Sequence, residues 1–196
     1  MSGPAAPADT GECARCFLSL LPDSNSRDAL LGCRQALEMS RNGAARGIRW
    51  LDAASLHLTL RFLGDSTRAQ VEFFKHMLPA LARPLPGSGA RRCAIWPNRA
   101  RPRLLVLELD APGELVALAQ ASEGLARKAG FAPEPRPFRA HLTLARLRPG
   151  CALHIPSVPL PTLAFESLSL MRSELQATGS RYQALACVPL SGSPHS

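Results

Sequence analysis

The chain has 196 residues, a net charge of +8 and a mean hydropathy close to zero. Its 46% apolar content excludes an intrinsically disordered chain, and the length suffices for one substantial core. No run of about 18 apolar residues is present, which excludes a membrane-spanning helix. The polar start lacks the form of a signal peptide. We therefore expect a cytoplasmic protein with one domain at 13–190, between disordered tails at 1–12 and 191–196.

The basic charge comes almost wholly from arginine, because Lys75 and Lys128 are the only lysines among 23 basic residues. A basic surface suits a phosphate-bearing partner such as nucleic acid. Arginine also matches the geometry of phosphate. A coding bias toward arginine, alanine and proline explains the same composition equally well, so composition leaves both explanations open.

Apolar periodicity and chain breakers predict more strands than helices. The expected strands are 13–21, 46–50, 56–63, 90–96, 103–109, 140–147, 163–170 and 182–189, and the expected helices are about 24–42, 67–83 and 112–129. Residues 133–139 must be extended, because their three prolines exclude a helix. No glycine-rich phosphate loop follows any of these strands.

The tetrapeptide His-Leu-Thr-Leu occurs twice, at 57–60 and 141–144, each time in a predicted strand. Residues i and i+2 of a strand face the same side, so each histidine should lie beside the threonine of its own copy. An arginine follows each copy, at Arg61 and Arg146. The apolar residues of these strands are expected to pack into the core behind the histidines: Leu58, Leu60, Phe62, Leu142 and Leu144.

Two histidines that face each other across a phosphate provide both an acid and a base near neutral pH. Each positioned acid or base accelerates the reaction by a factor of about 10²–10⁴. The hydroxyls of Thr59 and Thr143 are placed to donate hydrogen bonds to the phosphate oxygens. The remaining histidines lie on a predicted helix, in a connector and in the tail, and we interpret them as incidental: His76, His154 and His195.

Two pairs of residues have the spacing of zinc ligands, namely Cys13 with Cys16 and Cys151 with His154. However, Cys16 begins an apolar strand, and the second pair lies in a proline-rich connector. We expect reduced, buried or incidental thiols and neither a metal nor another cofactor.

The blocks around the two tetrapeptides, 56–64 and 136–146, resemble the 2H phosphoesterase superfamily. Within it the chain is similar to the bacterial RNA 2′,3′-cyclic phosphodiesterases once called 2′–5′ RNA ligases. Shorter matches occur at 15–17, 172–175 and 181–182. The chain departs from the family in having Ala140 in place of the usual proline and Met171 where an aromatic residue is common.

The resemblance implies an α+β, bilobal fold. In it two antiparallel sheets surround a central cleft, helices lie outside, and the halves are related by a pseudo-twofold internal duplication. It also implies metal-independent hydrolysis of a 2′,3′-cyclic phosphate at RNA ends to a 2′-phosphate. His57 would be the proton donor and His141 the proton acceptor, with Thr59 and Thr143 binding phosphate. We expect a monomer without an obligate protein partner.

Three further residues are candidates for substrate binding. Arg139 shares the strand face of His141, although it is equally well explained as an exposed strand-end charge. Arg172 is a weaker candidate for the same kind of contact. Phe17 offers a ring for base stacking, but an aromatic residue in a first strand more often belongs to the core. The open alternatives for function are a 2′–5′ RNA ligase, a phosphodiesterase for small cyclic nucleotides and a non-catalytic RNA-binding module.

Overall fold

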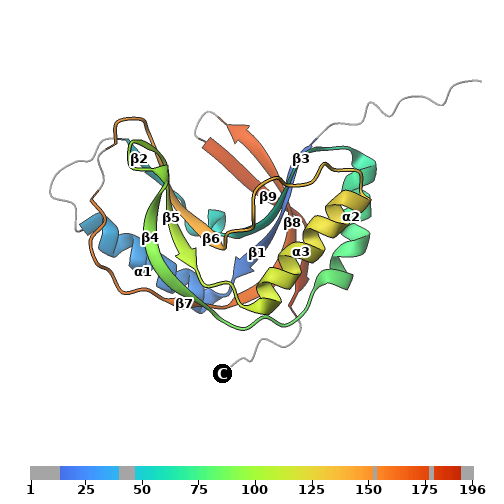
Figure 1. The fold of residues 1–196 in the computed structure, drawn as a ribbon, viewed down its shortest axis with the longest axis horizontal. Coiled ribbons are helices and arrows are strands. Elements are labelled where there is room, and N and C mark those ends of the chain that lie inside the picture. The colour runs from blue at the N-terminus through green and yellow to red at the C-terminus, as the bar shows by residue number, and fades with distance from the viewer. Residues whose placement is uncertain (1–13, 40–46, 152–153, 177–178, 191–196) are drawn as a thin grey trace, which may run out of the picture.

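The computed structural model describes residues 14–39, 47–151, 154–176 and 179–190. Within these residues the chain forms strands in the majority, three α-helices and one short 3₁₀ turn, in the order shown by colour in Figure 1. The strands are β1 (Ala14–Pro22), β2 (Ile48–Trp50), β3 (Leu58–Ser66), β4 (Ser88–Asn98), β5 (Arg101–Leu109), β6 (His141–Leu147), β7 (Thr162–Leu163), β8 (Phe165–Gln176) and β9 (Gly179–Pro189). The helices are α1 (Ser24–Met39), α2 (Arg68–Leu81) and α3 (Gly113–Lys128), and the 3₁₀ turn is η1 (Ala53–Ser55).

The strands form one curled antiparallel sheet in the order β7-β4-β5-β6-β3-β1-β8-β9, with β2 paired to the end of β6 (Figure 1). We call β3, β1, β8 and β9 the first arm, and β7, β4, β5, β6 and β2 the second arm. The arms are joined where β3 meets β6, through the single pair Leu58–Leu142. The expected α+β class is confirmed. The expectation of two separate sheets is corrected, because this one pair makes the arms continuous.

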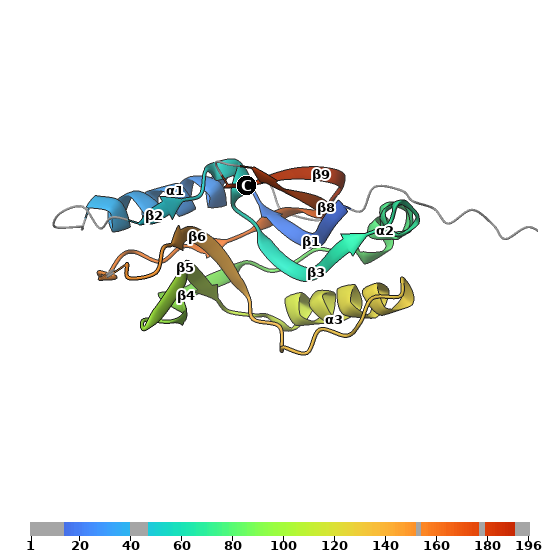
Figure 2. The same cartoon turned by 90° about the horizontal axis from the view of Figure 1, so that it is seen from above.

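The helices cover the arms from different sides. Figures 1 and 2 show α2 and α3 beside the first arm, with α1 at the opposite end of the molecule. Helix α3 packs against β3, and α2 packs against β8 and β9. The helix predicted at about 112–129 is confirmed as α3, and its buried residues lie at helical spacing: Leu115, Leu118, Ala119, Ser122 and Leu125. Among the described residues, no helix has the length and apolarity that a bilayer crossing requires.

Both motif strands contain a β-bulge directly after the threonine. The register of β3 against β1 skips Leu60, and the register of β6 against β5 skips Leu144. A bulge turns the residues after it to the other face of the sheet. The prediction that Phe62 packs into the core is therefore wrong: its side chain is 55% exposed, whereas Arg61 is buried.

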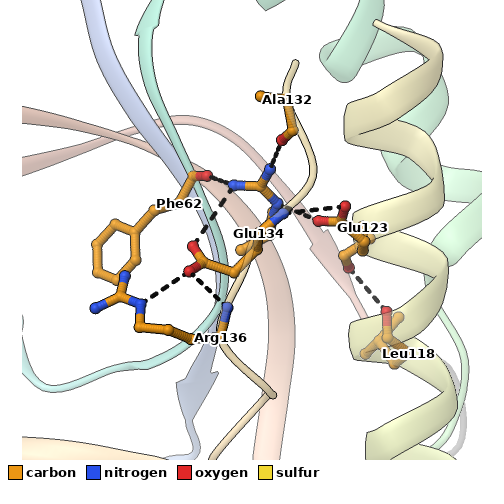
Figure 3. Close-up of polar contacts among 8 residues, drawn as sticks. Phe62, Leu118, Glu123, Ala132, Glu134 and Arg136 are labelled. Atoms are coloured by element: carbon orange, nitrogen blue, oxygen red, sulfur yellow. Dashed lines mark hydrogen bonds and ion pairs between the residues drawn. The ribbon is translucent and has the colours of Figure 1, made fainter. Parts of the chain in front are cut away.

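Buried Arg61 joins β3 to the segment that leads into the second motif. Its guanidinium donates to the carboxylate of Glu123 on α3 and to the carbonyls of Phe62 and Ala132. Glu134 lies 4.0 Å from the same guanidinium, and Figure 3 shows the acceptors converging from three segments. A buried charge is tolerated only with such a full set of partners. Arg61 is thus a structural residue, although it follows the histidine motif in sequence.

Candidate active site

The sheet joint brings the two histidine motifs together. His57 immediately precedes β3 and His141 is the first residue of β6, so each histidine is adjacent to the paired Leu58 and Leu142. In an antiparallel pair the neighbours on either side of a matched residue also face each other. His141 therefore lies opposite Thr59, and His57 lies opposite Thr143. The two imidazoles and two hydroxyls share one face, while the leucines between them are buried in the core.

Each imidazole is held in the same way by the backbone. Nδ1 of His57 bonds the carbonyl of Ser55 at 2.8 Å, and Nδ1 of His141 bonds the carbonyl of Arg139 at 2.7 Å. A carbonyl accepts but does not donate, so Nδ1 must carry the hydrogen in both histidines. Nε2 is then the nitrogen that gains or loses a proton. This is the arrangement that an acid–base pair requires.

His57 lies in an aromatic environment on the first arm. Its ring is 4.9 Å from that of Phe17 on β1 and 5.0 Å from that of Tyr182 on β9, centroid to centroid. The Tyr182 hydroxyl accepts a 3.3 Å hydrogen bond from Arg146, which reaches across from β6. Because Arg146 follows the bulge in β6, it occupies the same relative position as Phe62 does in β3.

His141 lies in an ionic environment on the second arm. The ring of Trp96 is 4.4 Å from its imidazole, and the guanidinium of Arg139 stacks 4.0 Å above that same indole. The carboxylate of Glu108, the cross-strand neighbour of His141, accepts hydrogen bonds from the side chains of Trp96, Arg139 and Arg92. Glu108 thereby fixes the indole and one guanidinium beside the imidazole.

The two environments shift the histidine pKa values unequally. Burial lowers the pKa of His57 to about 4, the bond to the Ser55 carbonyl opposes this, and the charges of His141 and Arg146 lower it further. Burial also lowers the pKa of His141, the charge of Arg139 adds to this, and the carboxylate of Glu108 acts in the opposite direction. Both imidazoles are consequently neutral at pH 7 in the free protein.

The structure assigns different places to the three predicted substrate-binding residues. Arg139 is exposed beside His141, within reach of the histidine face. Phe17 is 2% exposed and contacts the His57 ring, so its influence on the site goes through that imidazole. Arg172 on β8 pairs with Cys16 on β1. Cys16 faces the side of the sheet opposite to its neighbour Phe17, so Arg172 does not lie on the histidine face. Arg172 forms an ion pair with Glu174.

The sequence interpretation missed Trp96 and Glu108, and it noted Tyr182 only within a short family match. Glu108 carried a usable signal, because it is the only charged residue in the apolar run 104–109. A charge within a buried strand often marks a functional position. Trp96 carried no comparable signal, because its relation to His141 depends on pairing between three strands.

A pocket of about 350 Å³ opens beside His141, on the side of Glu108. It is lined by Arg91, Arg92, Trp96, Glu108, Leu109, Ala111, Phe138, Arg139 and Ala140. Within the part of the chain that the structure describes, no three His, Cys, Asp or Glu side chains gather as a metal site. The thiol of Cys16, one of the zinc-spaced cysteines, is buried. Cys13 lies outside the described residues.

Comparison with known proteins places this geometry in a family. The LigT-like phosphoesterase family matches twice, at residues 21–106 and 107–182, so that each match contains one histidine motif. A Thermus thermophilus protein named RNA 2′,3′-cyclic phosphodiesterase is 30% identical over 161 residues, which cover 75% of this chain and 78% of that protein. A Bacillus subtilis protein of the same name is 28% identical over 113 residues. That match covers 55% of this chain and 62% of the relative.

Solved structures show the same fold. The crystal structure of TT0787 from T. thermophilus superposes with a TM-score of 0.71 at 26% identity, covering 92% of this chain and all of that one. Escherichia coli LigT in complex with 3′-AMP superposes with a TM-score of 0.72 at 24% identity, covering 92% and 99%. Together with the double match of the family, which spans most of the sequence, these likenesses show that the chain belongs to the LigT-like phosphoesterases of the 2H superfamily.

Proposed function

We propose that this protein hydrolyses the 2′,3′-cyclic phosphate at RNA ends to a 2′-phosphomonoester, with His57 as proton donor and His141 as proton acceptor. The observation that carries the proposal is the pairing at the sheet joint, which sets two Nδ1-anchored imidazoles and two threonine hydroxyls on one face. The names of the relatives support the choice of substrate. Binding alone would need no such proton-transfer pair.

A cyclic phosphate between the motifs is positioned for in-line attack by water. The hydroxyls of Thr59 and Thr143 donate to its non-bridging oxygens and stabilise the charge that builds up on them in the transition state. Nε2 of His141 takes a proton from the attacking water, and Nε2 of His57 gives a proton to the departing 3′ oxygen of ribose. One P–O bond forms, one breaks, and the phosphate remains on the 2′ oxygen.

The two environments suit these roles. His57 is neutral in the free protein, so it must gain its proton when the negatively charged phosphate arrives and offsets the effect of burial on its pKa. His141 is already neutral, as a base must be. The carboxylate of Glu108 beside it stabilises the imidazolium that forms when His141 accepts the proton.

The decisive test is to incubate the protein with a short RNA that ends in a 2′,3′-cyclic phosphate and to identify the product. We expect an RNA 2′-phosphate, which resists a phosphatase specific for 3′-phosphates, and we expect the same turnover in EDTA. Formation of a 3′-phosphate would contradict the assignment of the leaving oxygen. Loss of turnover in EDTA that added metal restores would contradict the metal-independent mechanism.

Two alternatives use the same site. Joining of RNA through a 2′–5′ bond would use an RNA 5′ hydroxyl in place of water as the nucleophile, with the same departing 3′ oxygen. A small cyclic nucleotide would need only the terminal part of the site. To test the small-nucleotide alternative, turnover of an RNA oligomer is compared with turnover of a mononucleotide cyclic phosphate. Incubation with a 5′-hydroxyl RNA acceptor and analysis of joined product tests the first.

We also infer that the two halves arose by internal duplication within a single bilobal domain, and that the protein acts in the cytoplasm as a monomer. The double family match supports the duplication, because each half matches the same family. The equivalent bulges after Thr59 and Thr143 and the equivalent Nδ1 bonds add support from geometry. The tails predicted at 1–12 and 191–196 lie outside the described residues.

A further inference from the structure

The net charge is concentrated on the second arm. Residues 47–52, 88–111 and 139–151, which hold β2, β4, β5 and β6, contain nine arginines and three carboxylates, which is +6 of the total +8. All nine arginines are exposed. A coding bias would spread arginine over the whole chain. Its concentration on one arm instead favours a function for this charge.

Six of these arginines lie at one end of the arm, which we call the arginine tip: Arg49, Arg99, Arg101, Arg103, Arg146 and Arg148. Arg49 is paired with Arg146 across β2 and β6, and Arg146 is paired with Leu104 across β6 and β5. The turn that joins β4 to β5 is closed by a hydrogen bond from the Arg101 amide to the side chain of Asn98, and it presents Arg99 and Arg101. The carboxylates of these strands lie toward their opposite ends.

Most of the tip charge is not neutralised by acidic side chains. On the first arm, Arg15 is paired with Asp65 and Arg172 with Glu174. Among the described residues, four tip arginines form no ion pair: Arg99, Arg101, Arg103 and Arg148. Like charges held close together repel one another, so such a cluster is costly to the folded protein unless a polyanion binds it.

The tip is continuous with the candidate active site. Arg146 lies on the histidine face, bonds Tyr182 beside His57 and lowers the pKa of that histidine. Trp96 and Leu104, which pair across β4 and β5, lie partly exposed between the tip and the histidines. A track of arginines with an aromatic ring is the combination that binds single-stranded nucleic acid.

We infer that the arginine tip binds the phosphodiester backbone of the RNA strand on the 5′ side of its cyclic phosphate, so that the protein prefers oligomers to mononucleotides. This inference rests on the proposed function, because the active site fixes where the 3′ end of the strand lies. Backbone phosphates carry no base information, so the tip selects for chain length and not for sequence.

The test compares two triple variants with equal loss of charge. Arg49 and Arg148 share the face of Arg146, because Arg49 pairs with Arg146 and Arg148 lies two residues beyond it. The tip variant carries Arg49→Gln, Arg99→Gln and Arg148→Gln. The control carries Arg68→Gln, Arg127→Gln and Lys128→Gln on α2 and α3. Two probes are used, a 12-nucleotide RNA ending in a 2′,3′-cyclic phosphate and adenosine 2′,3′-cyclic phosphate. Binding of the same RNA is followed by fluorescence anisotropy between 50 and 200 mM salt.

We expect the tip variant to raise KM for the 12-mer about tenfold at low salt and to leave turnover of the mononucleotide unchanged. The slope of log affinity against log salt should become shallower by about 2, since each phosphate contact on a single strand contributes about 0.7. The control triple should change the KM for the 12-mer and the salt slope by less than half as much as the tip variant does. Equal behaviour of the two triples with the 12-mer would overturn the inference.

Failure of the proposed function gives a different result. If the wild-type protein hydrolyses neither probe, the cyclic phosphodiesterase proposal is wrong, while the anisotropy measurement still decides whether the tip binds RNA. Wild-type protein that prefers the mononucleotide at every salt concentration would overturn the tip inference and leave the chemistry intact. Thermal unfolding of both triples shows that the compared proteins are equally folded.

Discussion

The two histidine motifs have the same backbone and different surroundings. Both lie at the start of a strand, both anchor Nδ1 on the carbonyl two residues before, and both have a bulge after the threonine. His57 contacts aromatic rings, whereas His141 contacts Trp96 next to a carboxylate and a guanidinium. The backbone thus provides two equivalent imidazoles, and the neighbouring side chains make them different. Two different tasks, giving and taking a proton, require such a difference.

The same contrast extends to the residues after each motif. Arg61 on β3 is 8% exposed and bonds α3 and the segment before β6, whereas Arg146 on β6 is exposed on the histidine face. The two arginines differ by one position relative to the bulge, and this single position places one in the core and the other at the site. Equivalent residue types in a repeat therefore need not have equivalent roles.

The strongest test of the comparison removes each imidazole in turn. We expect His57→Ala and His141→Ala each to lower kcat by about 10²–10⁴, because each removes one proton-transfer group. His76→Ala on the exposed face of α2 should keep full activity and serves as the control. If either site variant retains more than a tenth of the activity, the two-histidine mechanism is wrong.

A substrate that needs no acid distinguishes the two histidines. Thymidine 3′-(4-nitrophenyl phosphate) releases 4-nitrophenolate, which leaves without a proton. With this ester we expect His57→Ala to recover most of its lost rate relative to wild type, while His141→Ala remains inactive. Recovery of the rate by His141→Ala instead would show that His141 is the proton donor and His57 the proton acceptor.

The contrast between the arginines predicts effects on different properties. Arg61→Met leaves Glu123 and two carbonyls without their partner, so we expect the free energy of unfolding to fall by about 3 kcal/mol. Arg146→Met should lower turnover and change that free energy by less than about 0.5 kcal/mol. Chemical denaturation and initial rates measure both. Similar stability losses in the two variants would show that the bulges do not separate their roles.

Burial of His57 predicts a loss of stability in mild acid. Its pKa is about 6.5 when unfolded and about 4 when folded, so the unfolded state binds more protons between these values. The stabilisation is complete above about pH 6.5 and is lost as pH falls toward 4, by on the order of 2 kcal/mol. Urea denaturation at pH 7.5 and 4.5 should show a smaller difference in His57→Gln than in wild type. His76→Gln should behave as wild type; a wild-type response in both variants would contradict the prediction.

Neutralising Glu108 should produce the smallest change, about tenfold in kcat. Glu108→Gln keeps an acceptor for Trp96 but removes the negative charge beside His141, so the pKa of His141 should fall and the acidic limb of the pH–rate profile should move to lower pH. Glu72→Gln on α2 removes the same charge far from the site and should leave the profile unchanged. An unshifted profile in Glu108→Gln would mean that the carboxylate only supports the fold.

The sequence predicted those elements whose signals are local. A helix was expected at about 67–83, and the structure has α2 there, with the Thr67 hydroxyl accepting the amide of Gln70 at its start. The apolar face of α3 follows directly from helical spacing. The strand expected at 56–63 was to end at Leu63, and β3 instead continues to Ser66, because its partner β1 extends alongside it as far as Ala14.

The features that the sequence did not predict depend on pairing between distant strands. The bulges that expose Phe62 and bury Arg61 are visible only in the register of β3 against β1. The contact of Trp96 with His141 likewise depends on the pairing of β4, β5 and β6. Alternation along a strand assumes a regular ladder, and the alternation fails where the ladder skips a residue.

The Nδ1 bonds also constrain how the site is restored after each turnover. On the proposed mechanism, one hydrolysis leaves His57 without its proton and His141 with an extra one. Neither ring rotates to reload, because rotation would break its bond to the carbonyl of Ser55 or Arg139. His141 must then release its extra proton and His57 must take one up for the next substrate, each through Nε2, on the face that the product phosphate occupies. Product departure and proton exchange are therefore coupled, and a buffer that exchanges protons with this face should speed turnover wherever chemistry is not the slowest step.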